Sequence, residues 1–483
     1  MKKFYIFLFC CLITIGLGIG SCGENTPEPD PCETNPQPGC PNYVDPCEAN
    51  PQPGCPNYVD PCEIDPQPGC PNYVDPCETN PQPGCPNYVD PEAPALAGTI
   101  TLGTVTYTVD STYREKLEDG FWYVYLQLKN AEKPLIIHSV RYATGTAGYS
   151  IETWIGEDLV TGKETPSAMV NRYDQAGRKV RVAINGGFYG TEVGGTAMGL
   201  EVMNGFISFP PAPDQPVIGF DAQNRPYMGY AALNAKVKGA DNNELDITTV
   251  NGTRYADYLV LYNSFKGSST NTNPWGTEAL CAPVTGQWES LDSYVNVPCK
   301  VEKMEYQDGS KGNMEIPKGK FVLSGHGVAF EYLNTWQEGD NVSVSLDYAF
   351  QSDPSINSTI IRNAVSGLYD VVLQNNTVVK PDMSSVAPGD EALVMSSHPR
   401  TSVGYTANKD FVFFTVVEGR REGIAAGVSY EELGQVMKYL GAANAINLDG
   451  GGSSCLMIGK QTMNYCTDGS QRAVANGLAI IKK

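Results

Sequence analysis

The feature that most constrains folding is a proline-rich repeat near the N-terminus. A unit of the form Asp-Pro-Cys-Glu-x-x-Pro-Gln-Pro-Gly-Cys-Pro-Asn-Tyr-Val occurs four times between Asp30 and Val89. Four prolines per unit fix φ and remove backbone N–H donors, so we expect neither a helix nor a central strand there. Because the apolar content is also too low for a core, the sequence predicts a disordered stalk of four 15-residue repeats at residues 30–89.

The repeats are also rich in cysteine, with two in each unit. Zinc sites favour cysteines separated by two to four residues, and these pairs are wider, so local disulfides in an oxidising compartment are the better interpretation. The pairing itself is open, because eight cysteines allow about 105 connectivities. In the same oxidising compartment, two further disulfides are plausible: Cys281 with Cys299, and Cys455 with Cys466. The repeat cysteines are Cys32, Cys40, Cys47, Cys55, Cys62, Cys70, Cys77 and Cys85.

The N-terminus has the pattern of a bacterial lipoprotein signal. Two lysines precede an apolar run from Phe4 to Ile19, and small residues then lead to Cys22. A transmembrane anchor is the weaker alternative, because the run is short for a bilayer span of about 20 residues. We therefore expect a signal peptide at residues 1–21, lipidation of Cys22, and a lipidated segment at residues 22–29. The expected location is the bacterial cell envelope, lipid-anchored to the outer membrane, on the periplasmic or the surface face.

The net charge of −21 is concentrated toward the N-terminus. The segment from Gly23 to Pro94 contains many Asp and Glu residues and no Lys or Arg. Nucleic acid is disfavoured as a partner, because binding it requires a basic face that neutralises phosphates. An acidic stalk instead keeps the chain soluble and extended.

The rest of the chain, after a linker at residues 90–97, is long enough for one large domain at residues 98–483. Strand-like runs rich in β-branched and aromatic residues dominate it. The clearest helix runs from Ser429 to Leu440, with Ser429 and Glu432 in the form of a capping box. We expect an α+β fold: a mixed β-sheet core with packed helices and a smaller β-rich subdomain around residues 316–346. The expected strands include residues 104–109, 122–128, 135–140, 179–184 and 411–417.

Polar residues and glycines follow several of these strand-like runs. Asn444-Ala-Ile-Asn-Leu-Asp-Gly-Gly-Gly-Ser-Ser454 passes from an apolar run into a carboxylate, three glycines and two hydroxyls. Glycines let main-chain N–H groups approach an anionic or polyhydroxylated ligand. A tight turn is the alternative for any one such segment. Similar segments occur earlier in the chain, at Asn185-Gly-Gly-Phe188, Arg400-Thr-Ser-Val-Gly404 and Glu418-Gly-Arg420. Four such segments together favour a functional site over four unrelated turns.

Taken in chain order, the segments at residues 185–188, 400–404, 418–420, 447–453 and 472–476 resemble the phosphodiester glycosidase family. The resemblance extends from about Gly98 to the C-terminus, and it implies the mixed-sheet core with packed helices. It also implies a hydrolase that cleaves the glycosidic bond of a sugar-1-phosphate diester, such as an N-acetylglucosamine-1-phospho-glycan. We expect no cofactor, a phosphosugar or glycan substrate, a monomer, and contact with the membrane through the lipid.

Candidate roles follow from the chemistry of a phosphate leaving group. A phosphate monoester departs as an anion, so positive charge matters more than a strong acid, and Arg400 and Arg420 are suited to grip its oxygens. Asp449 is expected to act on the anomeric side as nucleophile or base, while Glu418 orients Arg420 or assists proton transfer; the two carboxylates could exchange roles.

Substrate binding is assigned to residues of the same segments. Asn185 would hydrogen-bond the sugar or phosphate, the glycine backbones would donate N–H groups, and two hydroxyls would assist, although hydroxyls at such places more often cap turns. A catalytic role is less favoured for His398, and His138 and His326 are interpreted as structural residues. The glycines are Gly186, Gly187, Gly450 and Gly451, and the hydroxyls are Thr401 and Ser453.

Other chemistries are less well supported. No Gly-x-Ser-x-Gly elbow is present for a serine nucleophile. A metal stays undetermined: no spacing suits a transition metal, while a hard cation such as calcium held by Asp449 and backbone oxygens stays open. A glycan- or phosphosugar-binding surface lipoprotein without catalysis is the alternative function, and an adhesin that depends mainly on its repeats is a third.

Overall fold

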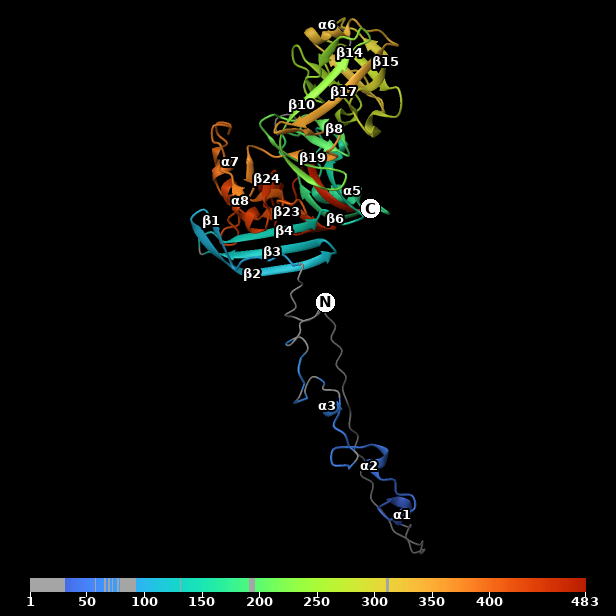
Figure 1. Ribbon diagram of the computed structural model, residues 1–483, viewed down its shortest axis with the longest axis vertical. Coiled ribbons are helices and arrows are strands. Elements are labelled where there is room, and N and C mark those ends of the chain that lie inside the picture. Colours follow the sequence, from blue (N-terminus) through green and yellow to red (C-terminus); the bar gives the residue numbers. More distant parts are fainter. Residues whose placement is uncertain are drawn as a thin grey trace, which may run out of the picture. The chain divides into compact units, whose positions relative to one another are not determined.

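The computed structural model describes residues 31–56, 58–64, 67, 70–71, 73–75, 78, 93–130, 132–190, 196–309 and 312–483 (Figure 1). The predicted signal peptide, Cys22 and residues 22–29 lie outside the described residues, as do Cys77 and Cys85. The chain divides into two compact units, Met1–Pro91 and Glu92–Lys483. No helix in the described ranges is both long and apolar enough to cross a membrane.

The first unit contains the proline-rich repeats, and three of them begin with one helical turn: α1 (Pro31–Thr34), α2 (Pro46–Ala49) and α3 (Pro61–Ile64). The prediction that the repeats contain no helix is therefore wrong. Proline is well suited to the first helical position, where no N–H donor is needed. The preceding aspartate caps the turn: the Asp45 carboxylate accepts from the N–H of Cys47 at 2.9 Å.

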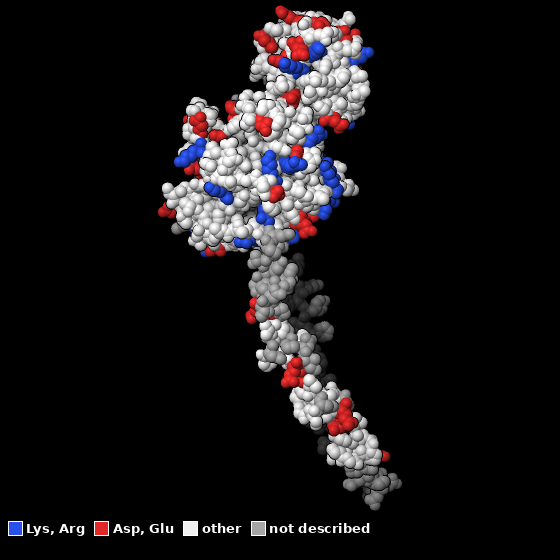
Figure 2. Space-filling model, viewed as in Figure 1, with Lys and Arg blue, Asp and Glu red and all other residues white. Residues whose placement is uncertain are grey.

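Three disulfides close these repeats, each between the two cysteines of one unit: Cys32–Cys40, Cys47–Cys55 and Cys62–Cys70. The prediction of local disulfides is confirmed for these three units. The described residues of this unit carry acidic side chains and no basic ones (Figure 2). The acidity seen in the sequence is therefore a property of the repeats themselves.

The second unit corrects the predicted fold class. Strands make up 41% of the structure and helices 12%, and the strands form large curled sheets. The expected α+β fold with a helix-packed mixed sheet is therefore wrong. Among the described strands, β12 (Thr249–Val250) and β13 (Leu259–Tyr262) form the one parallel pair, and all other pairs are antiparallel. The reason is that the β-branched and aromatic runs pack sheet against sheet, which leaves few apolar faces for helices to cover.

The first sheet has nine strands and contains most of the predicted ones. In spatial order its members are β1 (Thr99–Leu102), β2 (Val105–Glu118), β3 (Phe121–Lys129), β4 (Leu135–Ala143), β23 (Phe411–Val417), β22 (Arg400–Tyr405), β24 (Asn444–Asn447), β20 (Val371–Gln374) and β21 (Thr377–Val378).

A five-stranded sheet packs on one face of the first. Its strands, in order, are β26 (Gln461–Thr462), β25 (Leu456–Ile458), β6 (Lys179–Asn185), β27 (Asn476–Lys482) and β5 (Tyr149–Ile155). Side chains of both sheets, such as Phe414 and Ile446 from the first and Ile184 and Leu478 from the second, form one buried core. This contact brings the ends of β6 and β24 together.

The third sheet has thirteen described strands and forms a β-rich lobe, at the top of Figure 1. This lobe is larger than the predicted subdomain and has its own core around Trp288 and Phe321. Its strands in order are β12, β13, β16 (Phe321–Gly325), β14 (Thr277–Pro283), β15 (Val297–Glu305), β17 (Asn341–Phe350), β10 (Pro226–Lys238), β9 (Pro216–Phe220), β19 (Asn363–Ser366), β7 (Glu201–Met203) and β8 (Phe206–Phe209), with β11 (Glu244–Asp246) beside β10 and β18 (Asp353–Asn357) beside β17.

Four α-helices in the described part of this unit support the sheets. The predicted helix is confirmed as α8 (Tyr430–Tyr439), with the capping box of Ser429 and Glu432 in place. It packs on the outer face of the nine-stranded sheet through Leu433, Val436 and Met437. The others are α5 (Pro166–Tyr173), α6 (Val328–Leu333) and α7 (Glu391–Met395).

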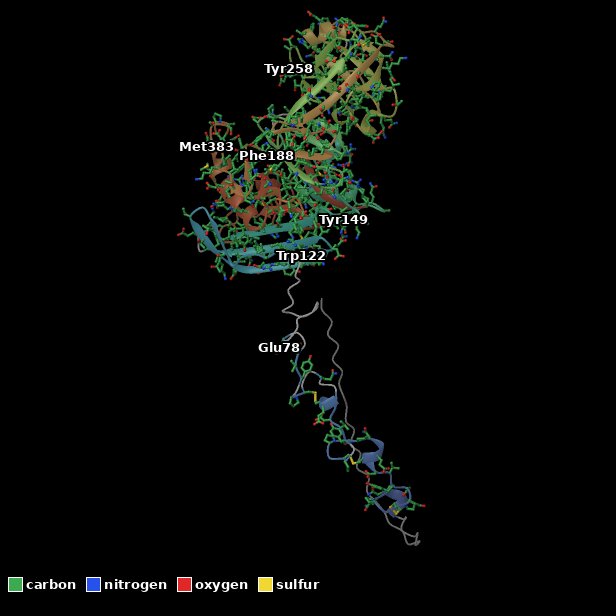
Figure 3. All side chains as sticks on the ribbon, viewed as in Figure 1. Glu78, Trp122, Tyr149, Phe188, Tyr258 and Met383 are labelled. Carbon is green, nitrogen blue, oxygen red and sulfur yellow. A yellow bond between two sulfur atoms is a disulfide. The ribbon has the colours of Figure 1, made fainter. Side chains whose placement is uncertain are left out.

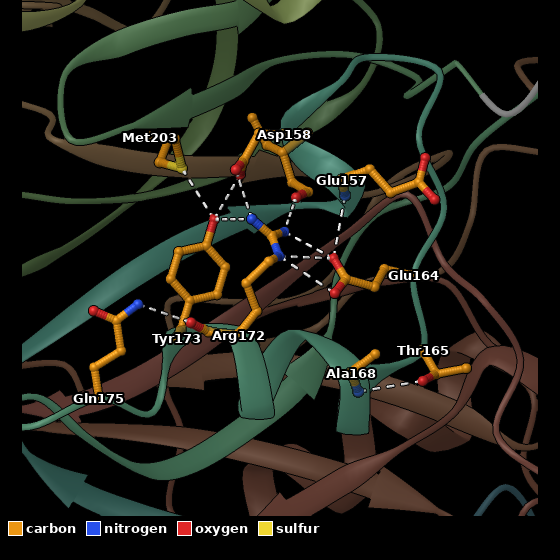
Figure 4. Close-up of polar contacts among 10 residues, drawn as sticks. Glu157, Asp158, Glu164, Thr165, Ala168, Arg172, Tyr173, Gln175 and Met203 are labelled. Atoms are coloured by element: carbon orange, nitrogen blue, oxygen red, sulfur yellow. Dashed lines mark hydrogen bonds and ion pairs between the residues drawn. The ribbon is translucent and has the colours of Figure 1, made fainter.

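Helix α5 is held in place by a charged cluster around Arg172 (Figure 4). The guanidinium pairs with Asp158 at 2.6 Å and with Glu164 at 2.8 Å, and it donates to the main-chain oxygen of Ile155 at 2.8 Å. The apolar face of α5 packs against β6 through Met169. The cluster therefore helps to fix the strand that ends at Asn185.

Candidate functional site

The four predicted polar segments meet at one end of the packed sheets. Strand β22 runs antiparallel to β23 and β24, so its first residue, Arg400, lies opposite Val417, and Ser402 lies opposite Asn447. The start of β22 therefore lies beside the ends of β23 and β24. From the second sheet, Asn185 at the end of β6 reaches this place.

Glycines permit this close approach. A Cβ on Gly186 would collide with the Asn476 side chain, and one on Gly187 would collide with the main-chain oxygen of Ser366. Gly451 has a φ of +60°, a left-handed conformation that side chains rarely adopt. The N–H groups of Gly186 and Gly187 bind the main-chain and side-chain oxygens of Asn476, at 2.9 and 2.6 Å. These two donors are thus used inside the protein.

Asn185 is fully engaged as a clamp. Its Nδ2 donates to the main-chain oxygen of Asp449 at 2.7 Å, and its Oδ1 accepts from Thr401 Oγ1 at 2.8 Å and from the N–H of Cys455 at 3.0 Å. Asn185 and Thr401 are both buried. In this structure they hold the segments together, and their predicted contact with substrate stays a prediction.

Arg400 is also occupied. Its guanidinium is buried and donates to three main-chain oxygens: Val428 at 2.9 Å, Leu393 at 2.6 Å and Ser396 at 3.0 Å. It lies over the ring of Tyr430, 4.8 Å from the centroid. Burial lowers the pKa of Arg400 to about 10. Arg400 therefore stabilises the main chain between Leu393 and Val428.

Glu418 lies in a buried hydrogen-bond chain. His138 Nε2 and the N–H of Tyr465 bind Oε1 at 3.0 and 2.8 Å, while Arg421 Nη1 donates to Oε2 at 2.6 Å. Burial acts to raise the pKa of Glu418, but the hydrogen bonds from His138, Tyr465 and Arg421 outweigh it and lower that pKa. The arginine that Glu418 pairs with is Arg421 and not Arg420, so the predicted pairing is wrong at this point. His138 also bonds Tyr123 at 2.8 Å, in keeping with a structural role.

Asp449 differs from these residues because its side chain is partly exposed. Its Oδ1 accepts from the N–H of Gly450 at 2.8 Å, and its own N–H donates to the oxygen of Gly186 at 3.0 Å. Burial raises the pKa of Asp449 to about 6, against the opposing effects of the Ser453 hydroxyl, the Gly450 N–H and the Arg472 charge. Such a carboxyl changes its protonation state near pH 6.

Arg420 is the second accessible charged group. Its side chain is exposed, and a Cβ on Gly451 would lie 3.1 Å from Nη1, so the guanidinium covers the glycine turn that follows Asp449. Its Nη2 lies 3.2 Å from His398 Nδ1. Burial and the charges of Arg400 and Arg420 lower the pKa of His398, which favours the neutral ring. The φ of Arg420 is +58°, a strained value for a side chain of this size.

The structure adds two residues to which the sequence analysis assigned no role. Arg472 is exposed, pairs with Asp468 at 2.7 Å, and places Nη1 3.5 Å from Ser453 Oγ. Tyr189 lies close to the same group, and burial followed by the Asp449 charge raises its pKa. Arg472 opened a segment of the family resemblance, and Tyr189 follows Asn-Gly-Gly-Phe directly, so both could have been marked in the sequence. Phe188 in Figure 3 marks the place of Tyr189 in the chain.

A buried carboxyl lies behind the glycine pair. Glu201 accepts from Ser208 Oγ at 2.9 Å and from Asn476 Nδ2. Burial raises the pKa of Glu201 to about 7, although both of these bonds act against it. Asn476 thus links this carboxyl to the Gly186–Gly187 turn.

Two further expectations concern metals and thiols. Within the described ranges, no group of three or more His, Cys, Asp or Glu side chains is placed to hold a metal ion. The two predicted cystines of this unit are not formed: Cys281, Cys299, Cys455 and Cys466 are free thiols. Cys455 and Cys466 nevertheless lie in hydrogen-bond contact, and this contact with burial raises the pKa of Cys455.

The comparisons with known proteins bear on this arrangement. Residues 296–481 match the phosphodiester glycosidase family. This C-terminal part of the chain is therefore similar to a phosphodiester glycosidase domain. The match includes Arg400, Glu418, Arg420 and Asp449, whereas Asn185 lies before it. No curated protein sequence matches the chain.

Two solved structures share the fold of this chain at low sequence identity, and a third is similar over much of its length at a lower TM-score. A hypothetical protein from Synechocystis has a TM-score of 0.60 at 15% identity, with 77% of this chain and 64% of that one covered. A putative exported protein from Burkholderia pseudomallei has a TM-score of 0.55 at 20% identity, covering 72% of this chain and 74% of that one. The catalytic domain of zebrafish N-acetylglucosamine-1-phosphodiester alpha-N-acetylglucosaminidase gives 0.38 at 12% identity, over 78% and 89%.

Proposed function

We propose that the phosphodiester glycosidase domain hydrolyses the glycosidic bond of a sugar-1-phosphate diester, with Asp449 as the reacting carboxylate. The observation that carries the proposal is a partly exposed carboxyl, with a pKa raised to about 6, on a glycine turn that two exposed guanidinium groups approach. Arg420 covers Gly451 of this turn, and Arg472 reaches Ser453 of the same turn.

The chemistry needs both signs of charge. The bond between the anomeric carbon and the phosphate oxygen breaks, water supplies a hydroxyl to that carbon, and the phosphate leaves as a monoester. Asp449 acts on the anomeric carbon as nucleophile or deprotonates the attacking water, which requires its ionised form. Arg420 and Arg472 stabilise the negative charge that develops on the departing phosphate.

The buried residues of the site position these groups. Asn185 holds the main chain at Asp449, and Arg400 holds the main chain at Leu393, Ser396 and Val428. Glu418 anchors the turn that contains Arg420 by its ion pair with Arg421. In the proposal these three residues act by orientation, without touching the substrate.

One observation favours a second candidate, a glycan- or phosphosugar-binding domain without catalysis. Cleavage of a glycosidic bond ordinarily uses two carboxyl groups, and Glu418 is committed to His138, Tyr465 and Arg421. A phosphate leaving group needs little protonation, and for that reason we favour the hydrolase.

The test is release of N-acetylglucosamine from a panel of sugar-1-phosphate diesters, UDP-N-acetylglucosamine among them, by the full chain. Turnover by the wild type that is lost in Asp449→Asn would support the hydrolase. Saturable binding of one diester, with no turnover of any, would replace it with the binding domain.

We also propose that the protein is anchored at the bacterial cell envelope by a lipid on Cys22, with the acidic repeats as a spacer. The support is the sequence alone: a charged and apolar N-terminal segment that ends in small residues before a cysteine. Cys22→Ser is expected to abolish incorporation of radiolabelled palmitate in a bacterial host. Equal labelling of the variant and the wild type would contradict the proposed lipid anchor at Cys22.

A further inference from the structure

Two adjoining cavities lie in the β-rich lobe, outside the site described above. Their volumes are about 150 and 340 Å³, and Gly252, Thr253 and Lys266 line both of them. Lys266 closes the short helical turn after β13 and so stands where the two cavities meet. Figure 3 labels Tyr258, which lines the larger one.

The lining of these cavities is basic, in a chain whose net charge is −21. None of the described residues that line either cavity is Asp or Glu, whereas Arg254 and Lys266 are both present. Arg254 is committed to Ser324 Oγ at 2.8 Å and to the main-chain oxygen of Asn273 at 2.7 Å. Lys266 therefore supplies the available positive charge.

Lys266 has no carboxylate partner in the described part of the chain. Its ammonium lies over the ring of Tyr262, 5.3 Å from the centroid, and burial lowers the pKa of the amine. A partly buried ammonium without a counter-ion is stabilised by any anion that enters the cavity.

Aromatic and polar groups complete the lining. Tyr255 is 60% exposed and packs edge-on against Tyr258, with ring centroids 5.5 Å apart. An exposed aromatic surface beside hydroxyl and amide groups is suited to the apolar face and hydroxyl rim of a sugar ring. The polar groups are Thr161, Thr196, Thr249, Asn251, Thr253, Thr270, Asn271, Thr272 and Asn273.

A chain of main-chain contacts joins this place to the candidate site. Tyr189, next to Asp449, forms a β-bridge with Ala197. The N–H of Ala197 bonds the oxygen of Val160, and the N–H of Val160 bonds the oxygen of Phe265 at 2.9 Å. Lys266 follows Phe265 directly, so a fixed path of backbone connects the two places.

We propose that these cavities form a second binding site, which takes an anionic carbohydrate: a sugar ring packs on Tyr255, and its phosphate or carboxylate group binds Lys266. The site goes beyond the proposed hydrolysis and does not depend on it, because binding here requires no turnover. Phosphorylated and uronic sugars share this chemistry.

The experiment is calorimetric titration of the full chain with glucose 6-phosphate, glucuronate, glucose and inorganic phosphate. It is carried out in an Arg420→Gln/Arg472→Gln background, so that anions do not report on the candidate catalytic site. We expect saturable binding of one or both anionic sugars, and binding of glucose and of inorganic phosphate that is at least ten times weaker. Which anionic sugar binds more tightly distinguishes the two sources.

Three variants in the same background assign the binding to these cavities. Lys266→Met and Lys266→Gln are each expected to weaken binding at least tenfold, and Tyr255→Ala to weaken it about fivefold. Lys300→Met removes an exposed lysine of β15 and should leave binding unchanged. The proposal is overturned if neither anionic sugar binds, if both folded Lys266 variants bind as tightly as their parent, or if inorganic phosphate binds as tightly as the sugars.

Discussion

Asn185 Nδ2 donates to the main-chain oxygen of Asp449 at 2.7 Å, so the last residue of β6 holds the residue that carries the proposed reacting carboxylate. The two residues are 264 positions apart in the chain and belong to different sheets. This hydrogen bond is one of three by which the buried carboxamide ties β6, β22 and the glycine turn together.

Removal of that clamp is expected to destabilise the domain. Asn185→Ala leaves Thr401 Oγ1, the N–H of Cys455 and the oxygen of Asp449 without their buried partner, at a cost of roughly 1–3 kcal/mol in the free energy of unfolding. Urea unfolding measures this cost. Asn341→Ala, at an exposed strand position, is the matched control and should change stability by less than about 0.5 kcal/mol. Equal effects of the two substitutions would contradict the clamp.

Asp449→Asn should abolish turnover while the fold persists. The amide keeps the size of the side chain and can still accept from the N–H of Gly450, but it can neither attack the anomeric carbon nor deprotonate water. We expect kcat to fall by about 10³-fold or more. Asp468→Asn changes a neighbouring carboxylate that pairs with Arg472, and a similar loss in that variant would shift the assignment away from Asp449.

The pH dependence of hydrolysis should report the raised pKa of Asp449. Because the ionised form is the reactive one, kcat/KM is expected to rise with pH and to reach half of its maximum near pH 6. Glu201, with a pKa of about 7, is another carboxyl that titrates close to this range. Glu201→Gln should therefore keep the midpoint of the kcat/KM profile near pH 6. If the variant loses that midpoint, the titration belongs to Glu201 and not to Asp449.

The same two carboxyl groups contribute to the change of stability with pH. A carboxyl whose pKa is higher in the folded than in the unfolded state binds more protons when folded, so stability falls as pH rises between the two values. For Asp449 this window runs from 3.8 to about 6, and for Glu201 from 4.5 to about 7. We expect the urea midpoint of the wild type to decline between pH 5 and 7, and Asp449→Asn/Glu201→Gln to show a flatter profile.

The two arginines of the predicted phosphate grip should respond differently to substitution. Arg400→Lys cannot reproduce three bonds to main-chain oxygens and should destabilise the fold by roughly 1–3 kcal/mol. Arg420→Lys should leave stability within about 0.5 kcal/mol of wild type, because Arg420 is exposed. Arg420→Gln should lower kcat/KM about 10²-fold or more by loss of a charge at the leaving phosphate. Thermal melts and initial rates measure the two effects, and a melt shift in Arg420→Lys equal to that of Arg400→Lys would argue against the distinction.

Local sequence signals anticipated the elements well. The capping box of Ser429 and Glu432 marked the start of α8, and the aromatic and β-branched runs marked strands such as β3 and β23. The fold class was nevertheless predicted wrongly, because local periodicity does not reveal which faces pack together. Phe414 and Leu478 come from two different sheets and belong to one buried core, where packed helices were expected.

The sequence by itself determined which residues gather at the site: the polar segments at the ends of β6, β22, β23 and β24 do meet, because strand ends carry their flanking residues to a common edge. Only the tertiary structure decided which of them are free to act. Asn185, Arg400 and Glu418 are buried and bound to protein partners, whereas Asp449 and Arg420 are accessible. That division depends on burial and on long-range hydrogen bonds, which arise from the packing of distant segments and leave no mark in the local sequence.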